Sequence, residues 1–177
     1  GATVKGDVDF DGNVVIDGDV TISTDVTGTA NDGVIDFASN TINAEGGGSN
    51  TESLTLSSGS GLITLGGTIG ATNGLDSFTL DSSAITISNN ISTDNGLIDI
   101  NAPVSLGGDV VFSSGTGTGN IEFSSTIDGT QDLTLSSGSG AVTVTGDIGA
   151  GTALTSLTIN AQDSETSSGK ITLTGDI

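Results

Sequence analysis

A nine-residue pattern recurs along the chain and constrains its fold more than any other feature. The pattern is Gly-x-h-x-h-x-x-x-h, where h is an apolar residue. Six copies follow it without change, beginning at Gly12, Gly61, Gly96, Gly119, Gly140 and Gly169. The copy from Gly33 carries one extra residue, the copy from Ser83 lacks the glycine, and the copy from Gly1 is degraded. Such recurrence predicts an architecture of stacked, similar units.

The spacing between copies indicates a longer repeat of about 85 residues, because a short, then medium, then long spacing recurs. We expect one solenoid domain over 1–177, with super-repeats at 1–82 and 83–168 and the start of a third at 169–177. The phrase LTLSSGSG, found at 54–61 and again at 133–140, stands before the motif in each super-repeat.

Each motif reads as a strand followed by a corner. In the copy from Gly61, Ile63 and Leu65 face one side of a strand and Thr64 faces the other, because side chains alternate along a strand. Ile69 then opens the next strand, and no helical period is present. A β-sandwich also uses short strands but has no reason to repeat every 20–30 residues. The sequence therefore favours an all-β parallel β-helix with roughly seven rungs, about 35 Å long at about 4.8 Å per rung.

The charge of the chain limits its partners. There are 22 acidic residues and two basic ones, which gives a net charge of −20. Nucleic acids and anionic membrane surfaces attract basic proteins, so the sequence predicts neither partner. No run of 18 apolar residues is present, and we expect no membrane insertion. The absence of a starting Met suggests a processed chain or an excerpt of a longer one.

The residue types argue against an enzyme. The chain has no His, Cys, Tyr, Trp or Arg, so neither a Ser-His-Asp nor a Cys-His site can be built from it. Two carboxylates can hydrolyse a glycoside, but Asp36, Asp99 and Glu122 occupy equivalent motif positions. Equivalent positions are typical of a solvated strand face. We expect no enzymatic activity and no organic cofactor.

One segment resembles a calcium loop. Asp7, Asp9, Asp11 and Gly12 match the D-x-D-x-D-G opening of such loops, in which oxygens converge on the ion. The twelfth position is Gly18, so the usual Glu is missing, and Asp17 or Asp19 would have to replace it. The alternative is that Val8 and Phe10 face inward and the aspartates face water. Calcium bound by these five aspartates is a hypothesis.

The phrases LTLSSGSGAVTVTGDIG, LTSLTI and GKITLTGDI resemble the β-strand repeats of filamentous-haemagglutinin-like and autotransporter-type bacterial exoproteins. The resemblance covers about residues 12–177 and identifies a style of repeat. It implies a right-handed parallel β-helix that is secreted by a bacterium and serves at the cell surface as a stalk, adhesin or matrix element. A cell-surface or glycan ligand would then be a partner. No secretion domain of such proteins is recognisable in the sequence.

We therefore expect a non-enzymatic extracellular structural or adhesive protein. Its ends offer no capping helix, so they would join either the rest of a longer repeat chain or another copy of the protein. The alternative is a filament subunit that stacks end to end and responds to calcium. Threonine pairs at 143–145 and 172–174 are similar to those of ice-binding faces, but most other copies carry Asp, Ser or Asn there.

Overall fold

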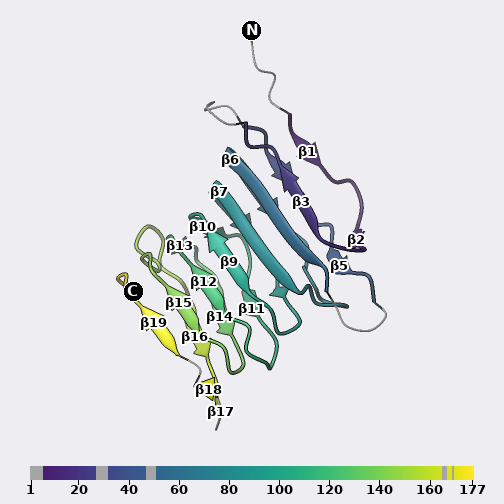
Figure 1. Cartoon of the computed structure of the whole chain (residues 1–177). Coiled ribbons are helices and arrows are strands. Elements are labelled where there is room, and N and C mark those ends of the chain that lie inside the picture. The colour runs from purple at the N-terminus through teal and green to yellow at the C-terminus, as the bar shows by residue number, and fades with distance from the viewer. Residues whose placement is uncertain (1–5, 27–31, 47–50, 165–166, 169) are drawn as a thin grey trace.

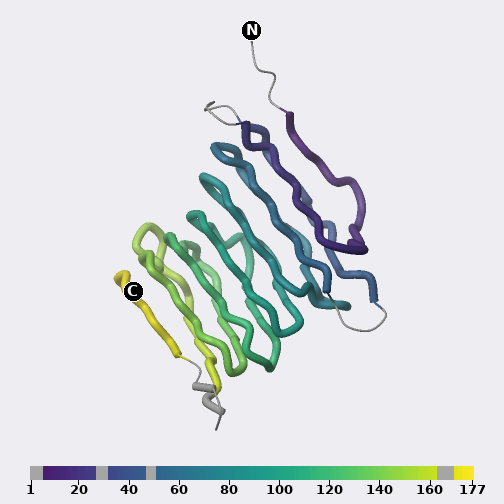
Figure 2. The backbone as a smooth tube through the Cα atoms, in the orientation of Figure 1, coloured from purple at the N-terminus to yellow at the C-terminus, as the bar shows by residue number. Residues whose placement is uncertain are grey.

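The structure, a computed structural model, describes residues 6–26, 32–46, 51–164, 167–168 and 170–177. In these ranges the chain forms strands and no helix. It is a parallel β-solenoid, in which successive turns of chain stack along one axis with the two chain ends at opposite ends of the stack (Figure 1). The backbone trace makes the coiling path visible (Figure 2). The all-β, stacked-strand fold predicted from the repeat is confirmed.

The strands form three faces, which the chain visits in the order 1, 2, 3 in every turn. Face 1 contains β1 (Val8–Asp9), β4 (Ile35–Asp36), β10 (Val104–Leu106) and β13 (Ile127–Asp128). Face 2 contains β2 (Val14–Ile16), β5 (Ile42–Ala44), β8 (Ile91–Ser92), β11 (Val110–Ser113), β14 (Asp132–Ser136) and β16 (Ser156–Asn160). Face 3 contains β3 (Val20–Ser23), β9 (Ile98–Asn101), β12 (Ile121–Phe123), β15 (Val142–Val144) and β19 (Ile171–Leu173).

Two long strands cross a corner. The strands β6 (Ser53–Leu65) and β7 (Ser77–Ile87) begin on face 3 and end on face 1, and their mutual register shifts at the corner between Ser57 and Leu62. Faces 1 and 3 are therefore joined into one hydrogen-bonded sheet. A short antiparallel hairpin of β17 (Asp163–Ser164) and β18 (Ser167–Ser168) lies between faces 2 and 3 in the last turn.

The strand register defines seven rungs. The inward ladder of face 1 runs Val8, Ile35, Ile63, Ile85, Val104, Ile127, Ile148. That of face 2 runs Val14, Ile42, Ile69, Ile91, Phe112, Leu135, Ile159. That of face 3 runs Val20, Leu54, Phe78, Ile98, Ile121, Val142, Ile171. Each ladder has seven positions, so six full turns separate the first rung from the last, in agreement with the sequence prediction.

The inward ladders form one core along the axis of the solenoid. The inward residues of the middle rungs are almost fully buried, and stacked rungs bring like residues together. Phe10 stacks flat on Phe37 with ring centroids 4.2 Å apart, and Phe112 meets Phe123 edge to face at 5.0 Å. Each such side chain contributes about 1.5–3 kcal/mol by leaving water, so the core stabilises the fold in proportion to the number of rungs.

The first glycine of the motif is required by close packing between rungs. A methyl group built on Gly61 would lie 2.0 Å from the carbonyl oxygen of Gly33, one rung below. The same holds in the later rungs, where a methyl group on Gly140 would lie 2.0 Å from the carbonyl oxygen of Gly119. The recurring glycine therefore marks a corner where two backbones touch. A side chain there would push neighbouring rungs apart.

A buried hydroxyl completes one corner in each of the first six rungs. The Ser137 Oγ donates a 2.7 Å hydrogen bond to the carbonyl oxygen of Gly140, and the Ser58 Oγ donates to that of Gly61 at 3.1 Å. Both serines have no exposed surface. The corresponding corners use Thr24, Ser82, Thr93 and Ser114. These hydroxyls satisfy carbonyl groups that the tight corner leaves without a strand partner.

Candidate functional site: corners, acidic side chains and open edges

Asn and Asp side chains link one rung to the next at the strand entries. The Oδ1 of Asn13 accepts a hydrogen bond from the N–H of Thr41 at 3.0 Å, and the Oδ1 of Asn120 accepts one from Ala141 at 2.9 Å. The same bond is made by Asn90, Asp109 and Asp147. The acceptor always lies one rung before the donor. The motif's Asn and Asp residues therefore have a structural role that composition did not reveal.

Two of the five predicted calcium ligands belong to this set of rung-linking side chains. The Oδ1 of Asp7 accepts a hydrogen bond from the N–H of Val34 at 2.9 Å, and the Oδ1 of Asp19 accepts one from the N–H of Ser53 at 3.0 Å. Asp7 lies at the entry of face 1 and Asp19 at the entry of face 3. The structure thus distributes these two carboxylates over different corners.

The other three predicted ligands, Asp9, Asp11 and Asp17, are exposed to solvent. Val8 and Phe10 are partly buried, and Phe10 packs on the core. Among the residues that the structure describes, no three acidic side chains lie close enough together to hold a metal ion. Calcium binding by this segment stays a prediction, and it would require the side chains to move together when the ion binds.

The three acids of the motif, Asp36, Asp99 and Glu122, lie on outward strand positions of two different faces. Asp36 is on face 1, beside Asp9 in the neighbouring rung. Asp99 and Glu122 are direct neighbours on face 3. Amide groups accompany this second pair: the Asn101 Nδ2 donates to the Asp99 Oδ2 at 2.9 Å, and the Asn120 Nδ2 donates to the Glu122 Oε1 at 3.2 Å.

Face 3 presents one outward column in register through all seven rungs. The column consists of Thr21, Thr55, Thr79, Asp99, Glu122, Thr143 and Thr172. The sequence could not reveal this alignment, because the threonines belong to segments of different spacing. The two acids interrupt the hydroxyl column at its middle, and the paired threonines of 143–145 and 172–174 occupy only the last two rungs.

Two buried acidic residues, Asp32 and Glu52, were missed by the sequence analysis. Asp32 is 4% exposed and accepts hydrogen bonds from the backbone N–H and the Oγ of Ser60, at 2.8 and 2.9 Å, and from the N–H of Val26. Gly59 packs against it with a positive φ of 52°. Asp32 thus anchors the corner between faces 3 and 1, and only its place before Gly33 in the motif could have indicated it.

The first rungs leave part of the core open at the N-terminal edge. A cavity of about 330 Å³ is lined mostly by inward apolar residues of the first two rungs, among them Phe10, Val14, Ile16, Phe37 and Leu54. Among the residues that the structure describes, the edge strands β1, β2 and β3 each pair with a strand on one side only. This edge therefore offers both apolar surface and backbone hydrogen-bonding groups.

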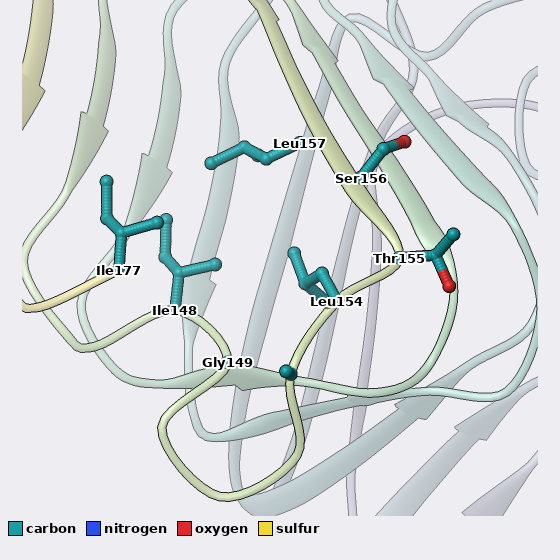
Figure 3. A pocket seen from close by; sticks show the side chains of 8 residues that line it. Ile148, Gly149, Leu154, Thr155, Ser156, Leu157 and Ile177 are labelled. Atoms are coloured by element: carbon teal, nitrogen blue, oxygen red, sulfur yellow. The ribbon is translucent and has the colours of Figure 1, made fainter.

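The last rung is open in the same way at the C-terminal edge. A cavity of about 280 Å³ is lined by Ile148, Leu154, Leu157 and Ile177 together with small and polar residues. The four apolar side chains project into the same space (Figure 3). Ile171 is 46% exposed and Ile177 is 75% exposed, although both stand where inward residues stand in the rungs before them.

These features define a parallel β-solenoid repeat protein with an acidic, hydroxyl-rich exterior and two apolar edges. Comparison of the chain with protein-family models, with curated proteins and with solved structures gave no match. The resemblance to haemagglutinin-like repeats therefore stays a prediction. No helix in the described ranges has the length and apolar character needed to span a membrane.

Proposed function

We propose that the chain is a non-enzymatic extracellular structural element, a rigid rod that serves as an adhesin stalk or as part of a matrix fibre. The observation that carries this proposal is the unbroken register of three ladders through seven rungs. Strand-to-strand hydrogen bonds in such a solenoid point along its axis, so a pull or a bend along the rod loads many bonds at once. A stack of like rungs also sets a length that grows with the number of repeats.

The exterior supports an extracellular location. Outward positions carry Ser, Thr, Asn and acids, and the net charge of −20 keeps neighbouring rods apart in solution. With no cysteine, the fold needs neither an oxidising nor a reducing compartment. A cell-surface or glycan ligand belongs to this proposal as the target of the adhesin, bound by another part of a longer chain or by the outward columns.

Immunogold electron microscopy of intact cells of the source organism tests the proposal. An antibody against the folded rod should label the outside of the cell or the surrounding matrix, and removal of the gene should reduce surface attachment. Purified chain should appear as short rods. Labelling confined to the interior of permeabilised cells would contradict the proposal.

A second candidate function, a filament subunit, is favoured by the two apolar edges. A copy of the chain stacked on Ile171, Leu157 and Ile177 would bury these side chains and pair the free edge strands β16 and β19. A further rung of the same chain would do the same. A second copy and a further rung would both continue the inward ladders. The edges therefore support either an end-to-end filament or a longer rod.

The filament is tested with a charge placed on the edge. Wild-type chain should form fibres that grow with concentration in light scattering and electron microscopy. Ile171→Lys should abolish this growth, because an edge lysine opposes strand addition. Val111→Lys, on the side of face 2 at 36% exposure, is the matched control and should leave growth unchanged. Monomeric wild-type chain at all concentrations would exclude the filament and leave the stalk.

A further inference from the structure

We infer that the rod displays one surface unit twice, on two different faces, because the sequence repeat and the three-sided solenoid are out of phase by one face. The repeat is carried by 54–80 and 133–159, which align without a gap at a spacing of 79 residues. The inference deepens the proposed structural function and rests on it for its biological use. Its test concerns geometry alone, so either can fail without the other.

The register places the two aligned segments differently. Leu54 lies on face 3, paired with Val20 and Phe78, whereas its equivalent Leu133 lies on face 2, paired with Val110 and Leu157. The following strands shift in the same sense. Ile63 is on face 1 and its equivalent Val142 is on face 3.

The cause is the number of strand positions in the repeat. From Leu54 to Leu133 the chain passes eleven inward ladder positions, whereas four full turns of a three-sided solenoid need twelve. The second segment therefore begins one face early. The second copy of the repeat is thus rotated about the axis of the rod by a third of a turn, about 120°, from the orientation that a repeat of twelve positions would give it.

The fold tolerates this shift because its corners are interchangeable. The buried serine of the LTLSSGSG phrase closes the corner from face 3 to face 1 at Ser58, and the corner from face 2 to face 3 at Ser137. The glycine with positive φ follows in both, at Gly59 and Gly138. The inward positions of all three faces accept Leu, Ile, Val and Phe, since face 1 adds Phe37 and Leu65 to its ladder of Val and Ile. No face therefore requires a particular segment.

Five outward hydroxyl residues of the strands are identical in the two segments. In the first segment Thr55 and Thr79 are neighbours in register on face 3, and in the second Thr134 and Thr158 are neighbours in register on face 2. Ser57 and Ser77 likewise correspond to Ser136 and Ser156. Four inward positions have changed conservatively: Ile63, Leu65, Phe78 and Leu80 correspond to Val142, Val144, Leu157 and Ile159. The other seven differences lie mostly in the corners, so the shared surface is the set of strand hydroxyls.

The consequence is a display in two directions. A partner that recognises these shared outward hydroxyls meets them at two places whose faces point different ways. One rod can then hold two partner molecules that do not collide, which is a cross-linking arrangement. A repeat in phase with the rungs would instead place both copies on one face, about 19 Å apart along four rungs, where large partners exclude each other.

Distances between paired spin labels test the inference, and the lack of native cysteine makes the labelling specific. Thr55→Cys with Thr134→Cys labels equivalent positions of the repeat. Thr55→Cys with Thr143→Cys labels two positions on face 3, four register steps apart. Double electron–electron resonance should give the longer distance for the first pair and the shorter one, near the four-rung spacing, for the second.

The reverse order of the two distances would overturn the inference, because it would place Thr134 on the face of Thr55. A second set of variants makes the test independent of the first set. Thr79→Cys with Thr158→Cys labels equivalent positions of the repeat, and Thr79→Cys with Thr172→Cys labels two positions on face 3. Circular dichroism must show that each variant keeps its strand content.

The same cysteines, carrying biotin, test the display. The 55/134 variant should bind two monovalent streptavidin molecules, seen projecting from different sides of the rod in electron microscopy. The 55/143 variant should bind one, or two with reduced affinity for the second. Equal binding of two molecules from a single side in the 55/134 variant would contradict display in two directions.

Discussion

At the residue scale, the first glycine of the motif has a packing role only where a neighbouring rung lies against it. Gly140 touches the carbonyl oxygen of Gly119, whereas Gly12 stands at the same motif position with no atom within 4 Å of an added methyl group. The two glycines look identical in the sequence. Only the presence of a neighbouring rung distinguishes them.

We therefore expect Gly140→Ala to lower the free energy of unfolding by about 1–3 kcal/mol or more, because the methyl group overlaps backbone that cannot move freely. Gly12→Ala is the matched control and should leave the stability unchanged or raise it by a few tenths of a kcal/mol. Urea unfolding followed by circular dichroism measures both. Equal effects of the two substitutions would show that the rungs do not touch at Gly140.

The buried corner serine makes a second residue-scale prediction. Ser137→Ala removes the donor to the carbonyl oxygen of Gly140 and leaves that buried acceptor without its hydroxyl partner, at a cost of about 1–3 kcal/mol. Ser136→Ala, next to it but facing outward, should cost less than about 0.5 kcal/mol. The difference between the two urea midpoints is the measurement, and a difference near zero would contradict the role of the buried hydroxyl.

At the element scale, the alternation of each strand was predictable and its face was not. The h-x-h pattern correctly predicted that Ile63 and Leu65 point inward and Thr64 outward. It could not predict that the motif from Gly61 runs from face 1 to face 2 while the motif from Gly140 runs from face 3 to face 1. Side-chain alternation is a local property, whereas the face depends on how many corners the chain has already turned.

The corners should accept changes in length that the strands do not. Insertion of one glycine after Thr116, in the exposed turn between faces 2 and 3, should change the stability by less than about 1 kcal/mol. Insertion of one glycine after Glu122, within β12, reverses the orientation of the rest of that strand and should prevent a single cooperative transition. Thermal unfolding of the two variants compares them, and similar melting curves would contradict the assigned strand boundaries.

The candidate site shows the same division between local and long-range information. The alternative interpretation of the sequence, in which Phe10 faces inward, is confirmed. The hydrogen bonds that Asp7 accepts from Val34 and Asp19 accepts from Ser53, however, join residues 27 and 34 positions apart. No local motif encodes such a partner. A match to D-x-D-x-D-G therefore described the spacing of the aspartates and not their surroundings.

At the scale of the whole molecule, the charge of −20 acts against the compact rod. Sodium chloride raised from 10 to 500 mM shortens the Debye length from about 30 Å to below about 8 Å and should raise the melting temperature by several degrees. Scanning calorimetry at a series of salt concentrations measures the effect. A melting temperature that is independent of salt would show that the carboxylates are too far apart to repel one another.

Calcium is distinguished from general screening at matched ionic strength. If the segment from Asp7 to Asp19 binds the ion, calcium at about 100 times its dissociation constant should add about 2.7 kcal/mol of stability beyond that given by sodium. Asp9→Asn with Asp11→Asn should remove this difference, while Asp147→Asn, at the other end of the rod, should not. Equal stabilities in calcium and sodium would contradict the predicted site.

The one-face shift between equivalent segments also bears on how such a chain can change length over generations. Residues 54–61 and 133–140 are identical in sequence. If their coding stretches also match, unequal recombination between them would delete or duplicate 79 residues. After such a deletion, Leu133 would take the place of Leu54 on face 3, and its buried serine would close the corner that Ser58 closes now. The product keeps a continuous core and loses three and two-thirds turns. Recombination of this kind can therefore change the length of the rod while each protein product keeps a continuous core.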